Sequence, residues 1–420
     1  MTVDLPCRSA HLEPDSSFPL AHHYDVVIVG GGIVGLTLAC GLRGTKLRVA
    51  VIESQTAERA ASRPRAYAFS PVSAKILSGL GLWDEVGPQL THFRRVQLSD
   101  ADYSKALTFR PEDGRSDAVY YSAEHTVLMK ALQSAVGSAQ NIDYWCEAQV
   151  LGAEANTTLT VECQKDGPAA EQMTFYTQLV VGADGARSGV RDRANIKTFG
   201  WKYWQSCITA VLEPEQAHAN TAYEKFWPSG PFAILPLREN RCQVVWTAPH
   251  QEAKDMLALP KPQFLAELSR RYGDQMGGLT LVNEPMVFPV QLMQSRQYVR
   301  PGVALVGDAA HCCHPVGGQG LNMGIRDATA LAEVLAQAAV KQEPLGSLAV
   351  LKRYERWRKT ENWFTLSLTD FLNRSFSNRF WPLLVARRAG IWVISSIGPL
   401  KRLILKLMTG FFGKLPSKAR

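Results

Sequence analysis

Residues 24–35 read Tyr-Asp-Val-Val-Ile-Val-Gly-Gly-Gly-Ile-Val-Gly, an apolar run that ends in glycines and then becomes apolar again. The run over 24–29 is typical of a central parallel strand, which is buried on both faces. Gly30 permits a tight turn, Gly32 lets the backbone approach a pyrophosphate, and Gly35 lets a helix pack closely on the strand. The stretch therefore predicts a strand, a phosphate-binding turn and a helix over 33–42.

An acidic residue follows where this arrangement needs one. A second apolar strand is predicted over 47–52, and Glu53 ends it, 23 residues after Gly30. A carboxylate at that place accepts hydrogen bonds from ribose hydroxyls and disfavours a 2′-phosphate. The unit therefore predicts FAD or NAD rather than NADP, at the start of a doubly wound α/β sheet.

Two later segments repeat the pattern of a buried strand that delivers a carboxylate. Residues 303–311 read Val-Ala-Leu-Val-Gly-Asp-Ala-Ala-His, so Asp308 is expected at the carboxyl edge of the sheet, placed to accept from a ribityl hydroxyl. A glycine-rich loop and a helix from about Leu321 follow, and the N-terminus of that helix favours negative charge. Residues 180–191 contain the turn Asp184-Gly185, which is ordinary alone and gains weight from the other two motifs.

The order of these segments predicts interrupted domains. A dinucleotide-binding domain is expected over 22–75, 115–195 and 297–345, after a flexible extension at 1–21. Residues 196–296 read mostly as strands, with one helix over 263–272. Together with the mixed segments of 76–114 they are expected to form a substrate domain. Residues 346–420 are helical in pattern. One cofactor would thus be held by pieces that are far apart in the sequence.

The net charge of +8 belongs to the end of the chain. Residues 371–420 hold ten Lys or Arg and no Asp or Glu, which leaves the first 370 residues at −2. Basic amphipathic helices of this kind can lie in an anionic lipid interface, and the other interpretation is a helical cap with a solvated basic face. Nucleic-acid binding is disfavoured because the basic residues alternate with apolar anchors.

Cysteine usage and apolar runs bear on the compartment. The eight cysteines lack a CxxC pair and suit buried thiols in a reducing compartment. The longest apolar run, 389–400, falls short of the ~20 residues that span a bilayer, and the N-terminus does not look like a secretory signal. We expect a cytoplasmic protein, peripheral to the inner face of a membrane if the basic helices bind lipid.

The three motifs, in this order and spacing, resemble the flavin-dependent aromatic hydroxylases related to p-hydroxybenzoate hydroxylase, over about residues 22–375. Within that group the chain looks most similar to the ubiquinone-biosynthesis hydroxylases of the 2-polyprenyl-6-methoxyphenol hydroxylase type. Three features carry this finer resemblance: His314-Pro315 before the loop 317–327, Ala222-Tyr223-Glu224 before 230–237, and Tyr354-Glu355 before Trp357-Arg358. It implies a Rossmann-like FAD-binding domain of the GR2 type, an inserted β-rich substrate domain and a C-terminal helical region.

The resemblance also implies which residues bind the cofactor, FAD. The ADP half would be held by Gly30, Gly32, Gly35 and Glu53. The flavin half would be held by Arg65, Gly307, Asp308, Gly318, Gly320, Leu321 and Asn322, whereas Asp184 and Gly185 match a motif implicated in binding both FAD and NAD(P)H. The chain departs from the family at 124–126, Glu-His-Thr instead of Glu-Asn-Arg, which leaves His125 open as a cofactor contact.

The implied chemistry is that NAD(P)H reduces FAD, O₂ forms a flavin hydroperoxide, and one oxygen passes to an aromatic, prenylated phenol. No acid–base residue is required, so none is assigned; His311 and His314 would relay a proton or only shape the loop. The run 311–314 does not predict a metal site, because consecutive ligands poorly share one tetrahedral ion. The alternatives are a prenyl-lipid reductase of the geranylgeranyl-reductase type and a non-catalytic flavin-binding component of a quinone-synthesis complex.

Overall fold

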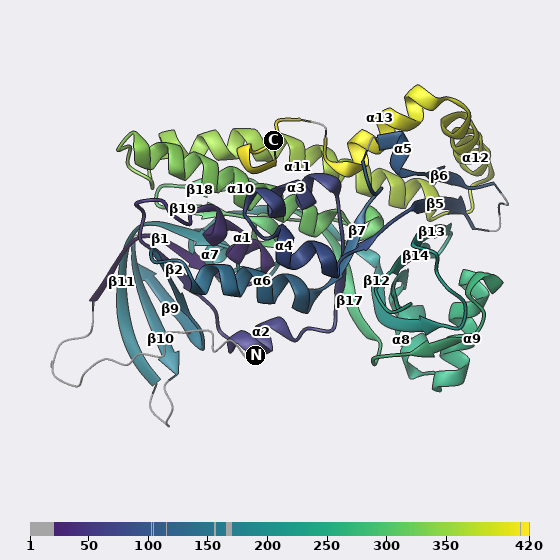
Figure 1. The fold of residues 1–420 in the computed structure, drawn as a ribbon, viewed down its shortest axis with the longest axis horizontal. Coiled ribbons are helices and arrows are strands. Elements are labelled where there is room, and N and C mark those ends of the chain that lie inside the picture. The colour runs from purple at the N-terminus through teal and green to yellow at the C-terminus, as the bar shows by residue number, and fades with distance from the viewer. Residues whose placement is uncertain are drawn as a thin grey trace.

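The computed structural model describes residues 21–420 except 102, 104, 115, 155–156, 165–169, 412 and 420. The extension predicted over 1–21 lies, apart from Ala21, outside the described residues. The fold is α/β, with a mixed sheet and covering helices at one end and a second, mainly antiparallel sheet at the other (Figure 1). Helices at the C-terminus complete it, so the predicted fold class is confirmed.

The first sheet brings the three sequence motifs to one edge. β1 (Ala21–Val29) pairs in parallel with β2 (Val49–Ile52) on one side and β11 (Ala170–Gly182) on the other. β19 (Val303–Leu305) pairs in parallel with β11. Because parallel strands end at the same edge, the turns after β1, β11 and β19 are neighbours. The other strands of this sheet are β8 (Ile142–Trp145), β9 (Ala148–Glu154), β10 (Thr158–Gln164) and β18 (Val299–Arg300).

Three helices pack side by side on this sheet. α1 (Ile33–Gly41) contacts both α6 (His125–Gly137) and α10 (Gln319–Val340), and their apolar residues join the largest core cluster. The predicted helices over 33–42 and from about Leu321 are thus confirmed within two residues. Shorter helices in this part are α2 (Ala57–Ala61), α3 (Pro71–Gly79), α4 (Trp83–Val86) and α7 (Gly189–Arg193).

The second sheet centres on the long strand β12 (Thr198–Pro214), which pairs antiparallel with β15 (Cys242–Pro249) and β17 (Met286–Ser295). The remaining strands of this sheet are β5 (Arg95–Asp100), β6 (Leu107–Phe109), β13 (Thr221–Trp227), β14 (Gly230–Pro236), β16 (Leu279–Leu281) and β20 (His311–Cys312). A small sheet holds β3 (Ala66–Phe69), β4 (Thr91–His92) and β7 (Tyr121–Glu124). Two helices interrupt the strands, the predicted one, α9 (Lys261–Tyr272), and an unpredicted one, α8 (His250–Ala258).

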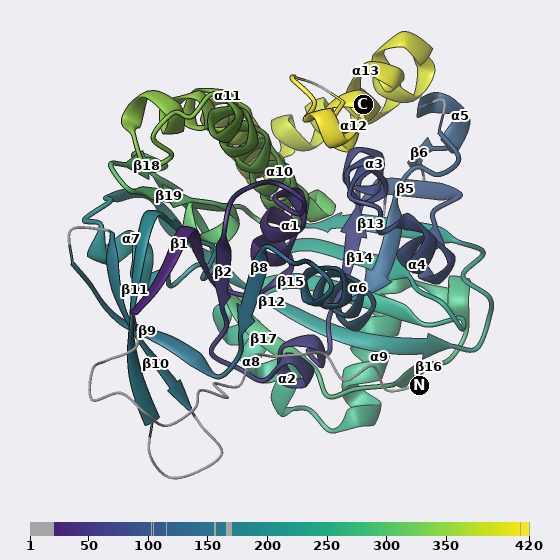
Figure 2. The same cartoon turned by 60° about the vertical axis from the view of Figure 1, so that its left-hand side comes forward.

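The C-terminal region forms α11 (Leu348–Phe376), α12 (Trp381–Ser396) and α13 (Gly398–Thr409). α11 runs along α10, whereas α12 and α13 turn away and cover β5, β6 and α5 (Pro111–Gly114) in both views (Figures 1 and 2). Among the described helices none is alone long and apolar enough to cross a membrane; α12 and α13 pass that test only as a pair bent by 105°.

Candidate active site

The glycine turn after β1 is crowded at Gly30, Gly31 and Gly35 and open at Gly32. A Cβ atom at Gly35 would lie 1.9 Å from the Gly30 carbonyl oxygen, and one at Gly30 would lie 2.5 Å from the Ala183 carbonyl oxygen. Gly30 also has a φ of +110°, which L side chains rarely adopt. At Gly32 a Cβ would meet nothing within 4 Å. Gly30 and Gly35 therefore let strand, turn and helix pack, whereas Gly32 leaves space beside the N-terminus of α1.

That space opens into a cavity of about 660 Å³ at the carboxyl edge of the first sheet. Its lining includes Gly30, Gly32, Glu53, Asp184 and Gly185, residues of two of the three predicted motifs. Glu53 is 6% exposed and accepts hydrogen bonds from the N–H groups of Gly31 (2.9 Å) and Gln55 (3.0 Å). These bonds fix its carboxylate at the cavity wall.

A second cavity, of about 390 Å³, continues from the first, and both are lined by Gly32, Arg63, Ala183 and Gly185. Its walls hold the predicted flavin-binding residues Arg65, Asp308, Gly318, Gly320 and Leu321. Gly317 and Gly318 have φ values of +69° and +60°, which bend the loop into the start of α10. Gly318 makes no side-chain cap, so the first N–H groups of α10 are open to an acceptor in the cavity.

Charge in this second cavity is arranged around Asp308. Asp308 is exposed to the cavity. The protein packed around it raises the pKa of its carboxyl by desolvation, while the nearby charges of His311 and Arg65 oppose that rise. The Arg65 guanidinium carbon lies 5.2 Å from the centre of the Phe288 ring. An aspartate and an arginine thus face one space that is large enough for a planar ring.

The donor and acceptor groups left open fit a dinucleotide such as FAD. Asp184 accepts from the Val190 N–H with Oδ2 (3.1 Å), but its Oδ1 is buried without a partner within the described chain. Thr209 Oγ1, in the second cavity, is likewise buried and unpartnered. A buried polar atom without a hydrogen-bond partner costs free energy in the folded state. A polar ligand that bonds to these two oxygens would therefore bind favourably.

Three predicted residues act behind the cavity walls instead of lining them. Gly35 packs against Gly30, as its predicted role requires. Asn322 is fully buried; its Oδ1 accepts from Ser70 N–H (2.8 Å) and Ser73 Oγ (2.7 Å), and its Nδ2 donates to the carbonyls of Ala68 (2.9 Å) and Gly318 (2.8 Å). Since these bonds occupy the whole amide, Asn322 holds β3 and α3 to the start of α10.

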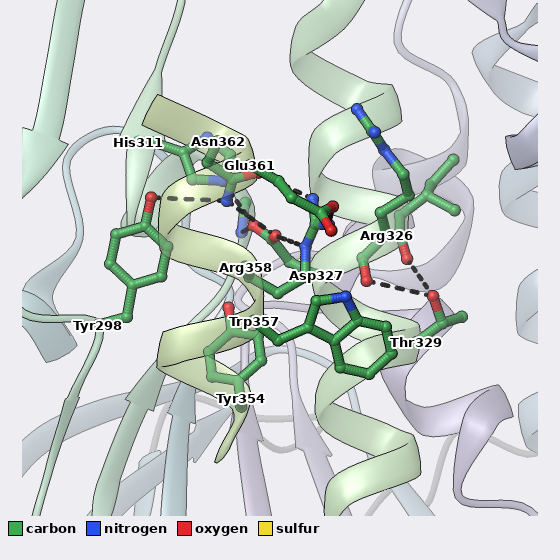
Figure 3. Close-up of polar contacts among 12 residues, drawn as sticks. Tyr298, His311, Arg326, Asp327, Thr329, Tyr354, Trp357, Arg358, Glu361 and Asn362 are labelled. Carbon is green, nitrogen blue, oxygen red and sulfur yellow. Dashed lines mark hydrogen bonds and ion pairs between the residues drawn. The ribbon is translucent and has the colours of Figure 1, made fainter. Parts of the chain in front are cut away.

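Gly307 is the third, and it is held by a buried network between α10 and α11 (Figure 3). Asp327 accepts from Gly307 N–H (3.3 Å), His311 Nε2 (2.5 Å), Arg358 Nε (2.8 Å) and Asn362 Nδ2 (2.9 Å). Because the Gly307 N–H is anchored on a buried carboxylate, the network fixes the turn that presents Asp308. His311 is therefore committed to structure rather than open to the cavity.

A third cavity, of about 70 Å³, lies on the far side of the loop 315–318. It borders the second cavity at Pro315 and Gly318, and Ala68, Leu235 and Val245 also line both. Its lining is almost wholly apolar; the exceptions include Tyr120 and Glu224. Met408 of α13 closes it from the C-terminal side. An apolar chamber thus adjoins the space that suits the flavin.

Several sequence candidates lie elsewhere. His314 is fully buried outside these cavities; burial lowers its pKa to about 3, and its Nδ1 accepts from the Val316 N–H (3.2 Å). Four large aromatic residues of the second sheet do not line the third cavity: Phe226 and Trp246 are in the core, whereas Trp201 and Trp204 are exposed. Within the described chain no group of three potential metal ligands occurs.

The sequence did not point to some residues that the structure brings to the cavities. Thr209, Gln243 and Phe288, from β12, β15 and β17, line the second cavity, and His125 lies beside them. His125 Nε2 is bonded to the Ala60 carbonyl (2.8 Å) and Nδ1 to the Tyr67 hydroxyl (3.2 Å). No motif marks Thr209, Gln243 or Phe288, and only alternation along the strands of the second sheet could have suggested them. His125 differs: its place in the family pattern left it open as a cofactor contact, and it lines the second cavity from α6.

Comparison with known proteins identifies the family. The sequence pattern of the FAD binding domain family matches residues 23–367. The chain belongs to this family. An uncharacterised protein of Synechocystis is 48% identical over 95% of this chain and 96% of its own length. The ubiquinone hydroxylase UbiL of Rhodospirillum rubrum is 37% identical over 92% of this chain and 89% of its own.

The fold agrees with a solved structure of the same kind. That of p-nitrophenol 4-monooxygenase from Pseudomonas putida superposes with a TM-score of 0.78 at 22% identity, covering 93% of this chain and 99% of that one. The family match and the similarity to the ubiquinone hydroxylase make the protein an FAD-dependent monooxygenase, and FAD is its cofactor. The first two cavities provide this monooxygenase with space for the cofactor, and the apolar chamber adjoins the second of them.

Proposed function

We propose that this monooxygenase hydroxylates the aromatic ring of a polyprenylated phenol on the way to ubiquinone or a related quinone. The observation that carries the proposal is the apolar chamber beside the predicted flavin space, with which it shares the loop 315–318 as a wall. The similarity to the Rhodospirillum rubrum ubiquinone hydroxylase supports the same substrate class.

The roles of the chain's own residues follow from their places. Gly32, Glu53 and Asp184 would hold the ADP half of FAD, and Asp308 and Arg65 the ribityl and ring portions. When bound and reduced by NADH or NADPH, FAD supplies the activation of O₂ and the transfer of one oxygen atom to the ring. The apolar walls of the chamber would orient the phenol and exclude water from the reacting atoms.

The first test combines a spectrum with an oxygen assay. Purified protein is expected to show a bound flavin spectrum, and a prenylated phenol is expected to stimulate O₂ uptake with NAD(P)H and gain one oxygen by mass. Bound flavin without phenol-dependent uptake would instead favour a prenyl-lipid reductase or a non-catalytic component. Failure to bind added FAD would contradict the assignment of the cavities.

We further propose that α12 and α13 rest on an anionic membrane surface, from which a prenylated substrate would reach the chamber. Exposed large apolar residues gather on these helices: Trp381 (72%), Trp392 (56%), Val385, Ile397 and Leu403. The basic residues divide into two groups. Arg387 and Arg388 pair with Asp100, and Lys401 pairs with Asp113, so these three fasten the helices to the protein. Arg379, Arg402 and Lys406 remain exposed and available to lipid phosphates.

The double substitution Trp381→Glu and Trp392→Glu is expected to reduce binding to vesicles that contain anionic lipid by at least tenfold. Burying one large apolar side chain contributes about 1.5–3 kcal/mol, and ~1.4 kcal/mol corresponds to a factor of ten. Co-sedimentation of the full chain measures the effect. Trp204→Glu, at an exposed tryptophan (48%) on β12, is the control and should leave binding unchanged. Equal binding by all three proteins would favour a helical cap that is not in contact with lipid.

A further inference from the structure

One carboxyl group in the apolar chamber is used by nothing described so far. Glu224 lies on β13, and its neighbours across the sheet are Leu98 on β5 and Ala233 on β14. Around it the chamber is lined by Ala222, Phe93, Val96 and other apolar residues. A carboxyl group in such a wall costs free energy unless it is bonded or has a use.

Glu224 has little else to bond to. Its Oε1 accepts from the Gly317 N–H (3.3 Å), on the loop that separates the chamber from the flavin space. Within the described chain no other hydrogen bond and no ion pair to Glu224 is found. Tyr120 is the titratable neighbour, but its hydroxyl is already bonded to the Met408 carbonyl oxygen and to Gln319 Nε2 (3.1 Å). The second carboxyl oxygen is therefore free to meet a ligand in the chamber.

We infer that Glu224 is a catalytic residue, the base that accepts the proton of the substrate's phenol hydroxyl as oxygen is added to the ring; this rests on the proposed function. The O–H bond breaks, its electron pair moves into the ring, and a new C–O bond forms to the oxygen atom that the monooxygenase reaction supplies. As the C–O bond forms, the O–O bond of the supplied oxygen breaks. The ring rearomatises when the hydrogen on the hydroxylated carbon leaves as a proton, which neutralises the departing oxygen, and Glu224 Oε2 returns its proton to the ring oxygen. A phenolate ring is a stronger nucleophile than a phenol ring, so the transfer speeds the oxygen addition.

The electrostatics of the chamber agree with this role. Burial raises the pKa of Glu224 to about 7, opposed only in part by the bond from Gly317. When the pKa of a base lies near the working pH, a large fraction of the base is deprotonated, and the base still binds the transferred proton strongly enough to promote its removal from the substrate. The deprotonated form must accept the proton, so hydroxylation should rise with pH through about 7 and then level off.

The test is Glu224→Gln, which keeps an oxygen acceptor for the Gly317 N–H but cannot take a proton. With a weakly acidic prenylated phenol, kcat is expected to fall about 100-fold with little change in KM. The rise of kcat with pH should disappear. NADH oxidation should continue, with H₂O₂ as its product. With a prenylated nitrophenol that is already ionised at the assay pH, the loss should shrink to a few-fold. Glu213→Gln, the same change at an exposed position of β12, is the control and should behave as wild type.

Two results would overturn the inference. One is a Glu224→Gln variant with the wild-type kcat and pH profile. The other is an equal loss of kcat with both phenols, accompanied by weakened FAD binding. That result would mean that Glu224 only supports the loop 315–318. Infrared spectra of the FAD-loaded protein give a readout without turnover. The carbonyl band of a protonated carboxyl that titrates near pH 7 should shift when phenol binds and be missing in the variant.

If the wild type hydroxylates no phenol, that result contradicts the proposed function but does not test whether Glu224 meets the ligand. The infrared measurement then still decides about Glu224, because a band that phenol leaves unmoved would show that this carboxyl does not meet the ligand.

Discussion

Replacing Gly35 by alanine is expected to give a protein that retains no flavin and unfolds more easily than wild type. The added Cβ would lie 1.9 Å from the Gly30 carbonyl oxygen, a backbone atom that no side-chain rotation can move. α1 would have to shift away from β1, and overpacking of this kind costs about 1–3 kcal/mol or more. The shift also misplaces the N–H groups of the turn. Losing two charge-assisted hydrogen bonds, about 1.5–3 kcal/mol each, weakens FAD binding at least ~100-fold.

Gly32→Ala is the matched substitution, because it adds the same methyl group three residues away in open space. Nothing lies within 4 Å of its Cβ, and its φ of −76° suits alanine. Urea unfolding of the FAD-free Gly32→Ala protein should therefore follow wild type, whereas FAD titration should show weakened binding, since the methyl group occupies the space predicted for the pyrophosphate. If Gly32→Ala bound FAD as tightly as wild type, the pyrophosphate would have to lie elsewhere.

The edge of the first sheet could be predicted from the sequence because each motif there is local. A buried strand and a glycine turn follow one another at 24–35, and a buried strand leads to a carboxylate at 47–53, 180–184 and 303–308. Parallel strands must end together. The chamber could not be predicted in this way. Its walls come from β5, β13, β14 and α13, and only the pairing of β13 with β5, residues 95–100 against 221–226, brings them together.

Individual residues show the same limit. Asn322 stands in a glycine-rich loop motif and looks like a ring contact, but its amide is consumed by four bonds to β3, α3 and the loop. α8 was missed because only Ala253 of its nine residues is buried, so the apolar period that marks a helix is almost absent. Glu224 was visible only as part of a family resemblance; its isolation in an apolar wall depends on strands far apart in the sequence.

Replacing Arg358 by alanine is expected to destabilise the folded protein by about 3–5 kcal/mol, measured by urea unfolding. Arg358 and Asp327 are both fully buried, and the Nε–Oδ1 distance is 2.8 Å. Removing the guanidinium leaves the buried Asp327 carboxylate without this positive partner, and water cannot reach the carboxylate to replace it. Arg353→Ala, on the same helix, is the control. Its partner Glu343 is partly exposed, as Arg353 is, so Arg353→Ala should lower the free energy of unfolding far less than Arg358→Ala does.

The pH dependence separates lost charge pairing from lost packing. Burial alone would raise the pKa of Asp327, but His311 and Arg358 outweigh burial and hold that pKa below its ordinary value. A carboxyl with a depressed pKa in the folded state stabilises the fold fully above the unfolded value, ~3.9, and loses that contribution as pH falls through the folded value. The difference in the free energy of unfolding between wild type and Arg358→Ala should therefore be largest above about pH 5 and should become smaller below about pH 4. A difference that stays constant with pH would mean that Arg358 acts through packing, and that Asp327 and His311 alone hold the Gly307 turn.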